Sequence, residues 1–279
     1  MAAPHEGGGL GSPPCRSWLR TAPGVGSFNS ASPTPVPLSP WSSQQPDATV
    51  VQRSSKSSSP IGRANRRLKP WQCGMGTGRC RLLDHDPVRK ARLIEHCQPG
   101  THLSDSGAAR ALEILVELLP RLWKPAGEPF RSLADEAAPW REELPSVWQQ
   151  AGQPFERRLI DAAVEVLAEL ASSQGKEVLL HQDLHADNVL AAQREPWLVI
   201  DPKPLRGERE FGIASIVRAY ELGHEKKVVI GRLDLMTSEL SIDRERARLW
   251  SFAQTLAWSF EGTQVLTRHV ETARWLLLA

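Results

Sequence analysis

The stretch that decides the fold is HQDLHADNVL at residues 181–190, followed shortly by LVIDPKP at residues 198–204. Asp183 and Asn188 are five positions apart, and Asp201 ends the next apolar run. Transfer of a phosphoryl group to a hydroxyl needs a carboxylate that orients or deprotonates the hydroxyl, and oxygen ligands for Mg²⁺. Kinases supply a catalytic-loop Asp, an Asn five residues later, and an Asp beyond the next hairpin. The spacing predicts those three roles in that order.

The two histidines of the loop have more than one interpretation. As neutral imidazoles, His181 and His185 can brace the loop and fix the direction of Asp183. An alternative is a zinc site of a hydrolase, in which His181, Asp183 and His185 are the ligands. That site would need further ligands, and the sequence offers no second cluster of this kind. A polar surface loop with capping residues is the third interpretation, but it leaves the position of Asp201 unexplained.

Composition excludes several classes of protein. The 279 residues are 41% hydrophobic and 24% charged with a formal net charge of +2, which does not indicate a nucleic-acid-binding surface. No apolar run approaches the roughly 20 residues that span a bilayer, and the N-terminus has no apolar signal core. The four cysteines form no C-x-x-C pair. We therefore expect a reduced, cytoplasmic protein that binds neither nucleic acid nor membrane; its oligomeric state is not readable.

The chain changes character near residue 76. Residues 1–75 are rich in Ser, Pro and Gly, and we expect them to be largely disordered because they bury too little apolar surface. Residues 79–84 and 91–95 read as two strands joined by a turn. From residue 104 the sequence is mostly helical, with Ser104 or Asp105 as an expected helix cap.

Helical periodicity recurs over much of the remaining chain. We expect a helical stretch over 130–150 that Pro139 and Pro145 interrupt, and a clearer helix from about 159 to 170. Short strands are expected at 178–180, 189–192 and 197–201, the last two as a hairpin. Further helices are expected over about 209–222, 225–239, 243–260 and 264–278, with Asp243 as an N-cap.

These motifs together resemble the aminoglycoside phosphotransferase family, in particular the branch of streptomycin 6-kinases and hydroxyurea-resistance kinases. The resemblance covers about residues 79–279. It implies an α+β, protein-kinase-like fold: a β-rich N-lobe, a hinge, and a mostly helical C-lobe with a β-hairpin at the active site. On this basis the chain divides into the low-complexity segment 1–75, a partial N-lobe and hinge over 76–103, and the C-lobe over 104–279.

The resemblance also assigns roles to residues. It implies that Asp183 is the catalytic base, supported by His181 and His185, and that Asn188 and Asp201 hold Mg²⁺. LIEHCQPG resembles the hinge, where backbone groups near Glu95 and Cys97 would meet the adenine of ATP. The implied reaction is ATP-dependent phosphorylation of a hydroxyl on a small molecule, an aminoglycoside such as streptomycin. Acidic side chains near the cleft would bind its cationic groups; the candidates are Glu208, Glu210 and Glu261.

The first part of the chain departs from the family pattern. A Gly-rich phosphate loop and a strand lysine are expected in the N-lobe, yet GMGTG at 74–78 directly precedes the first predicted strand, and Lys56 and Lys90 stand in unsuitable segments. We therefore expect a truncated or degenerate N-lobe. Two alternatives follow: a catalytically impaired or non-catalytic ligand-binding relative, and a kinase of a metabolite alcohol.

Overall fold

The computed structural model describes residues 48–52, 77–86 and 91–279, which fall into two units. Of the described residues, 48–52, 81–86 and 91–95 belong to the smaller unit, and 77–80 and 96–279 belong to the larger. The chain passes from the smaller to the larger unit between Glu95 and His96.

The described part of the smaller unit is an antiparallel sheet in the order β1-β3-β2. Its strands are β1 (Ala48–Gln52), β2 (Leu82–Asp86) and β3 (Ala91–Glu95). The predicted pairing of β2 with β3 is confirmed. Strand β1 lies within the segment 1–75 that was expected to be largely disordered, and its sequence ATVVQ holds three β-branched residues that favour a strand. The rest of that segment, and Lys56 and Lys90, lie outside the described residues.

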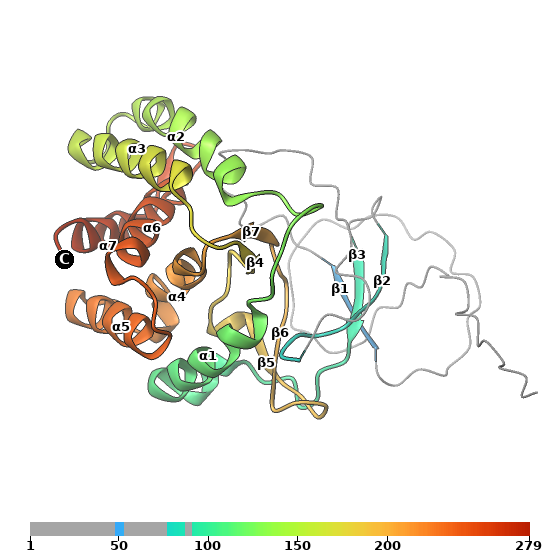
Figure 1. Ribbon diagram of the computed structural model, residues 1–279. Coiled ribbons are helices and arrows are strands. Elements are labelled where there is room, and N and C mark those ends of the chain that lie inside the picture. The colour runs from blue at the N-terminus through green and yellow to red at the C-terminus, as the bar shows by residue number, and fades with distance from the viewer. Residues whose placement is uncertain (1–47, 53–76, 87–90) are drawn as a thin grey trace, which may run out of the picture. The chain divides into compact units, whose positions relative to one another are not determined.

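The larger unit is built mainly of helices, and Figure 1 shows α2 running beside α3 and α6 beside α7. Its α-helices are α1 (Ala108–Leu122), α2 (Leu133–Gln150), α3 (Arg157–Ser172), α4 (Ala214–Val217), α5 (Lys226–Glu239), α6 (Arg244–Ala257) and α7 (Thr267–Leu277). Helix α3 confirms the helix expected over 159–170. Apolar residues on one face of α3 pack against α2 and α6, which places the core between these helices.

Aromatic side chains fill the centre of this core. The ring of Phe211 stacks on Trp140 of α2 at 6.3 Å between centroids and meets Trp250 of α6 edge-on at 5.3 Å. All three side chains are almost completely buried. Phe211 lies in the 3₁₀ helix η3 (Arg209–Ile213), so the core fixes the segment that leads from the strands to α4.

Helix α2 is continuous, so the expected interruption at its prolines is wrong. Pro139 has no N–H, which leaves the carbonyl of Asp135 without its helical donor. The guanidinium of Arg131 donates to this carbonyl instead, and it also pairs with Glu136 at 2.7 Å. A hydrogen bond from a side chain outside the helix to a carbonyl that a proline leaves without a donor, together with packing against α3, explains how a helix with two internal prolines persists.

Helix ends give one confirmed cap and one error. The Asp243 side chain accepts a hydrogen bond from the backbone N–H of Arg246 at 2.9 Å, as expected for an N-cap. Ser104 and Asp105 instead lie inside η1 (Leu103–Ser106), and α1 begins after Gly107 without a side-chain cap. The polar pair therefore marks a short turn before the helix rather than the helix start.

Two pairs of short strands hold the loop that contains the motif. β4 (Val178–Leu180) pairs with β7 (Leu205–Gly207), and β5 (Val189–Ala191) forms the predicted hairpin with β6 (Trp197–Val199). The chain leaves β4 at His181 and enters β5 through the 3₁₀ helix η2 (Ala186–Asn188). Both ends of the loop are thus anchored in paired strands.

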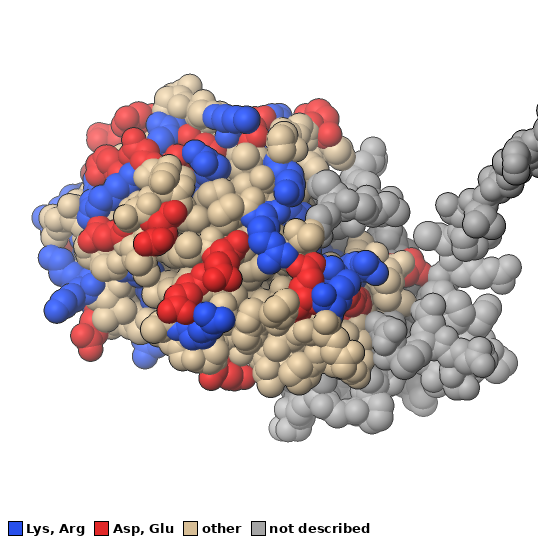
Figure 2. Space-filling model, turned by 60° about the horizontal axis from the view of Figure 1, so that its bottom comes forward, with Lys and Arg blue, Asp and Glu red and all other residues tan. Residues whose placement is uncertain are grey.

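The remaining short elements follow α4. They are η4 (Tyr220–Leu222), β8 (Phe260–Glu261) and β9 (Gln264–Val265). The last two form a small hairpin at the junction between the helices expected over 243–260 and 264–278. Among the described helices, none has both the length and the apolar character that crossing a membrane requires. Basic and acidic side chains are interspersed on the face of the protein shown in Figure 2.

Candidate active site

His181 is a buried, neutral histidine that ties the loop to the strand end carrying Asp201. Its Nε2 lies 2.8 Å from the carbonyl oxygen of Ile200, and its Nδ1 accepts from the backbone N–H of Asp183 at 3.3 Å. This pattern places the ring proton on Nε2. Burial lowers the pKa of His181 to about 4, so the ring is uncharged near neutral pH. Its predicted role in bracing the loop stays a prediction, and these contacts are the ones such a role would use.

Asp183 is an ionised carboxylate held between two cations. The ammonium of Lys203 bonds to its Oδ2, and a guanidinium nitrogen of Arg218 lies 3.8 Å from its Oδ1. Burial opposes ionisation of Asp183, but these two cations outweigh it and lower the pKa of the carboxyl to about 2. The side chain is 14% exposed. It can therefore accept a hydrogen bond from a hydroxyl without first losing a proton of its own.

Asn188 is oriented by its own loop. Its Nδ2 donates to the carbonyl of Asp183 at 2.8 Å and approaches His185 Nε2 at 3.1 Å. Both amide protons are thus directed at the loop. The amide oxygen, Oδ1, receives no hydrogen bond from the residues that the structure describes. It is a free oxygen donor of the kind that Mg²⁺ binds.

Asp201 follows β6 and adopts a left-handed backbone conformation, with φ of +43°. Ile200 joins it to the loop on both sides, because its N–H donates to the Asn188 carbonyl at 2.9 Å and its carbonyl meets His181. The negative charge of the Asp201 carboxylate favours the protonated form of His181, although burial outweighs this effect. An amide oxygen and a carboxylate, held by one backbone network, fit a Mg²⁺ ion.

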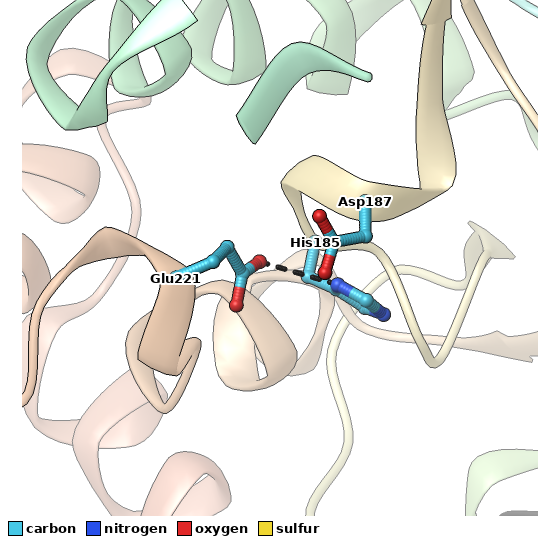
Figure 3. Close-up of side chains that lie close together, drawn as sticks. All are labelled: His185, Asp187 and Glu221. Atoms are coloured by element: carbon cyan, nitrogen blue, oxygen red, sulfur yellow. Dashed lines mark hydrogen bonds and ion pairs between the residues drawn. The ribbon is translucent and has the colours of Figure 1, made fainter. Parts of the chain in front are cut away.

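His185 is hydrogen-bonded to Glu221 and lies close to Asp187, as Figure 3 shows. Glu221 Oε1 lies 3.2 Å from His185 Nδ1 and accepts the N–H of Ala186 at 3.0 Å. Burial favours the neutral ring, but the bond to Glu221 and nearby carboxylates outweigh it and raise the pKa of His185. The same hydrogen bond lowers the pKa of Glu221 against the effect of burial.

The zinc interpretation of the loop does not fit these contacts. Both ring nitrogens of His181 are engaged by backbone groups, and both nitrogens of His185 face Glu221 or Asn188. A zinc ion needs an unprotonated nitrogen that points at it. The ion pair of Asp183 with Lys203 further opposes a second cation at that carboxylate.

A pocket of about 260 Å³ opens beside Asp183. Its walls are carboxylates, aromatic rings and one buried arginine; among them are Asp183, Arg218, Tyr220, Glu221, Trp258 and Glu261. Ligand pockets are commonly concave and mostly apolar, with a few convergent polar groups. The position beside the carboxylate makes this pocket the candidate acceptor site, and of the three predicted substrate acids it contains Glu261.

The other two predicted substrate acids do not line this pocket. Glu208 is 2% exposed, and its carboxylate accepts from Trp250 Nε1, from Arg246 Nε at 2.7 Å and from the N–H of Gly175 at 3.0 Å. It is a structural anion that joins α6 to the turn after α3. Glu210 lies in η3, and its negative charge contributes to the raised pKa of Arg246. Charge and sequence position alone could not separate these roles.

The two hinge residues differ in surroundings. Glu95 ends β3, where its N–H donates to the Arg81 carbonyl at 2.9 Å. Cys97 is buried in the larger unit, and its Sγ lies 3.8 Å from the Sγ of Cys80, so no disulfide bond joins the two. Their predicted contact with adenine stays a prediction.

Three residues beside the site were not predicted. Lys203 could have been suspected, because it stands two positions after Asp201 and the prolines on either side restrict its backbone. Arg218 lies 35 positions after Asp183, and Glu221 lies 36 positions after His185, in a stretch with several charged residues. No local pattern distinguishes them, and only the tertiary structure brings them to Asp183 and His185.

Comparisons with known proteins identify the family of this chain. The sequence model of the aminoglycoside/hydroxyurea antibiotic resistance kinases matches residues 41–262, and so begins earlier than the expected residue 79. A hydroxyurea phosphotransferase of Kitasatospora aureofaciens is 37% identical over 74% of this chain and 61% of its own length. A streptomycin 6-kinase of Streptomyces glaucescens is also 37% identical, over 70% of this chain and 65% of its own. The chain thus spans less than two thirds of the length of either relative.

Solved structures support the protein-kinase-like fold. Choline kinase LicA from Streptococcus pneumoniae matches with a TM-score of 0.53 and 14% identity, over 72% of this chain and 75% of its own. The same kinase in complex with AMP matches with a TM-score of 0.52. The match of the family sequence model extends over most of the chain and includes the whole loop. This chain belongs to the aminoglycoside/hydroxyurea antibiotic resistance kinase family.

Proposed function

We propose that this protein transfers the γ-phosphoryl group of ATP to a hydroxyl of a small molecule, most naturally an aminoglycoside such as streptomycin. The observation that carries the proposal is the placement of the Asp183 carboxylate at a pocket, with Asn188 and Asp201 tied to the same backbone network. Relatives that are named for streptomycin and hydroxyurea support the small-molecule acceptor. The AMP complex of choline kinase LicA supports a nucleotide as the donor.

In this reaction the acceptor oxygen forms a bond to the γ-phosphorus while the bond from that phosphorus to the β,γ-bridging oxygen breaks, and ADP leaves. The acceptor hydroxyl donates to Asp183, which takes its proton as the new ester forms. A carboxyl with a pKa of about 2 is a weak base, so it mainly orients the hydroxyl and receives the proton late. This suits phosphoryl transfer, in which positioning and electrostatics supply most of the catalysis.

The nucleotide is proposed to be held by Mg²⁺ and by the backbone. Asn188 Oδ1 and the Asp201 carboxylate would hold the ion, which neutralises phosphate charge when bound. Backbone groups near Glu95 and Cys97 are the proposed contacts of adenine. His181 and His185 hold the loop in place and take no part in proton transfer.

The pocket suits a cationic acceptor on its outer side. Glu261 is exposed there and Glu221 adds a second carboxylate, while Trp258 and Tyr220 supply flat apolar surface. A volume of about 260 Å³ is at the small end for ligand sites, so it would enclose one ring of an aminoglycoside and leave the rest outside. Hydroxyurea would fit entirely but gain little from these carboxylates.

The test is turnover by the purified full chain with Mg-ATP and either streptomycin or hydroxyurea, followed as ADP release and as phosphorylated product. We expect product with streptomycin, and its loss in the Asp183→Asn variant. Asp161→Asn is the matched control, because Asp161 is an exposed acid of α3 paired with Arg157. Absence of both turnover and Mg-ATP binding would contradict the proposal and favour a non-catalytic relative. Turnover only with an amino alcohol or sugar would identify a metabolite kinase.

A further inference from the structure

Lys203 is a buried lysine whose ammonium forms an ion pair with the carboxylate of Asp183. Its side chain is 6% exposed, and Nζ bonds to Asp183 Oδ2. The backbone N–H of Lys203 donates to the carbonyl of His181 at 3.0 Å, so the lysine is fixed to the same loop. Pro202 and Pro204 on either side restrict the backbone that carries it. The lysine is therefore held in place and not a mobile surface residue.

A second cation, Arg218, also lies beside Asp183. Lys203 is therefore not needed merely to neutralise the negative charge of this carboxylate. A guanidinium nitrogen of Arg218 lies 3.8 Å from Oδ1, and another donates to Gln254 Oε1 at 2.6 Å, which anchors it in the core. Both cations lie over the ring of Trp258, Arg218 at 4.5 Å and Lys203 Nζ at 5.5 Å. Two buried cations thus meet one carboxylate.

An excess of positive charge in a buried place is costly unless an anion shares it. The other acids near this group are already engaged: Glu221 with His185 and the Ala186 N–H, and Asp201 two residues before the lysine in the proposed metal role. The anion that the proposed reaction brings to Asp183 is the transferring phosphoryl group. An ammonium next to the base can touch that group and the base at once.

We propose that Lys203 is a further catalytic residue, which binds the γ-phosphoryl group of ATP while it stays beside Asp183. This inference rests on the proposed phosphotransferase function. As the acceptor oxygen bonds to phosphorus and the β,γ-bridging oxygen leaves with ADP, the Lys203 ammonium stabilises the charge on the oxygens of the transferred group and keeps its own proton. Positive charge for the phosphate then comes from the larger unit itself.

The experiment compares two nucleotides on the full chain with Mg²⁺, measured by calorimetry. One is the non-hydrolysable imido analogue of ATP, and the other is ADP, which has no γ-phosphate. We expect Lys203→Met to weaken binding of the ATP analogue roughly tenfold, as for one lost charge-assisted hydrogen bond. Binding of ADP should change little. Turnover should fall roughly 100-fold, the usual loss for one such donor, and Lys203→Arg should restore part of it.

Repeating the comparison in the Asp183→Asn variant distinguishes direct contact of Lys203 with phosphate from an effect of Lys203 through Asp183. In the Asp183→Asn variant, Lys203→Met should still weaken the ATP analogue selectively if the ammonium touches phosphate. If that selectivity disappears, Lys203 acts only as a partner of Asp183 and the proposal is overturned. Arg246→Met is the control, since it removes a cation from the buried pair with Glu208 away from the pocket and should affect both nucleotides alike.

The outcomes also separate this proposal from the function on which it rests. Turnover that depends on Asp183, together with equal binding of the ATP analogue by wild-type protein and Lys203→Met, would overturn the role of Lys203 and leave the phosphotransferase standing. Failure of the wild-type chain to bind either nucleotide would overturn both.

Discussion

The imidazole of His181 donates to the carbonyl of Ile200 at 2.8 Å, and this bond joins the two halves of the proposed catalytic machinery. On one side lies the loop with Asp183, whose N–H is bound by the same ring. On the other side lies Asp201, the residue after Ile200. The base and one proposed metal ligand therefore share a single buried connector, which fixes their separation more tightly than two independent loops could.

Removing the His181 imidazole should reduce turnover even though His181 does not contact the reacting groups. We expect His181→Ala to lower turnover roughly 10- to 100-fold, because small misplacements of reacting groups are costly. The free energy of unfolding should fall by about 1–3 kcal/mol, since a buried carbonyl loses its donor. His102→Ala is the control: its Nδ1 also meets a backbone carbonyl, that of Asp187 at 2.8 Å, but at an exposed site. Unchanged turnover in a folded His181→Ala protein would refute the connector role.

Glu221 should influence the Mg²⁺ concentration that turnover requires, because it holds His185, which in turn contacts Asn188. It binds His185 Nδ1 and the Ala186 N–H, and His185 in turn meets the amide of Asn188. We expect Glu221→Gln to raise the Mg²⁺ concentration for half-maximal turnover a few-fold, since a weaker hold on the loop leaves Asn188 Oδ1 less well directed. A Mg²⁺ titration at saturating ATP measures this. Glu239→Gln, an exposed change in α5, should leave the titration unaltered.

Glu208 and Glu261 should give opposite results, although both were predicted as substrate acids. Glu208→Gln should lower the free energy of unfolding by about 3 kcal/mol, because it leaves Arg246 in a broken, partly buried pair, with little change in KM for the acceptor. Glu261→Gln should leave stability unchanged and raise KM for streptomycin a few-fold, with no effect on hydroxyurea, which is neutral. Denaturant unfolding and acceptor kinetics on both variants provide the measurement. A shift in KM from Glu208→Gln alone would reverse the assignment.

The parts of the fold that follow from local spacing could be predicted. Asp183, Asn188 and Asp201 could be proposed together because a short loop and a tight hairpin leave little freedom in how far apart they lie; their roles stay predictions. The helix α3 was found because apolar residues recur at helical spacing without interruption. In each case neighbours in sequence are neighbours in space.

The parts that depend on distant residues could not be predicted. Helix α2 continues through Pro139 because Arg131 donates to the exposed carbonyl, and nothing in the local sequence announces that bond. Strand β1 was concealed because composition was averaged over 75 residues, whereas a partner strand needs only five. Arg218 reaches Asp183 from a segment 35 positions away, so its role depends on how α4 packs in the core.

His269 should make the protein sensitive to acid. Its Nδ1 lies 2.6 Å from the hydroxyl of Tyr220, and burial, followed by the charge of Arg218, lowers the pKa of His269 to about 3. Burial also raises the pKa of Tyr220 to about 12, so the phenol remains the donor and the imidazole the acceptor. The folded protein thus keeps a neutral ring at pH values where the unfolded chain, with an ordinary pKa near 6.5, takes up a proton.

The sign of the effect follows from proton uptake. Since only the unfolded state binds this proton between about pH 6.5 and pH 3, stability from His269 is complete above pH 6.5 and is lost as the pH falls through that window. The slope is up to about 1.4 kcal/mol per pH unit. His269→Asn keeps an acceptor for Tyr220 but does not titrate, so its free energy of unfolding should fall less steeply from pH 6.5 to pH 5. His185, whose pKa is raised, contributes the opposite slope in both proteins and cancels in the comparison. Denaturant unfolding at several pH values, with exposed His96→Asn as control, decides the matter: equal slopes for wild type and His269→Asn would mean that the buried ring takes up its proton over the same pH range as in the unfolded chain.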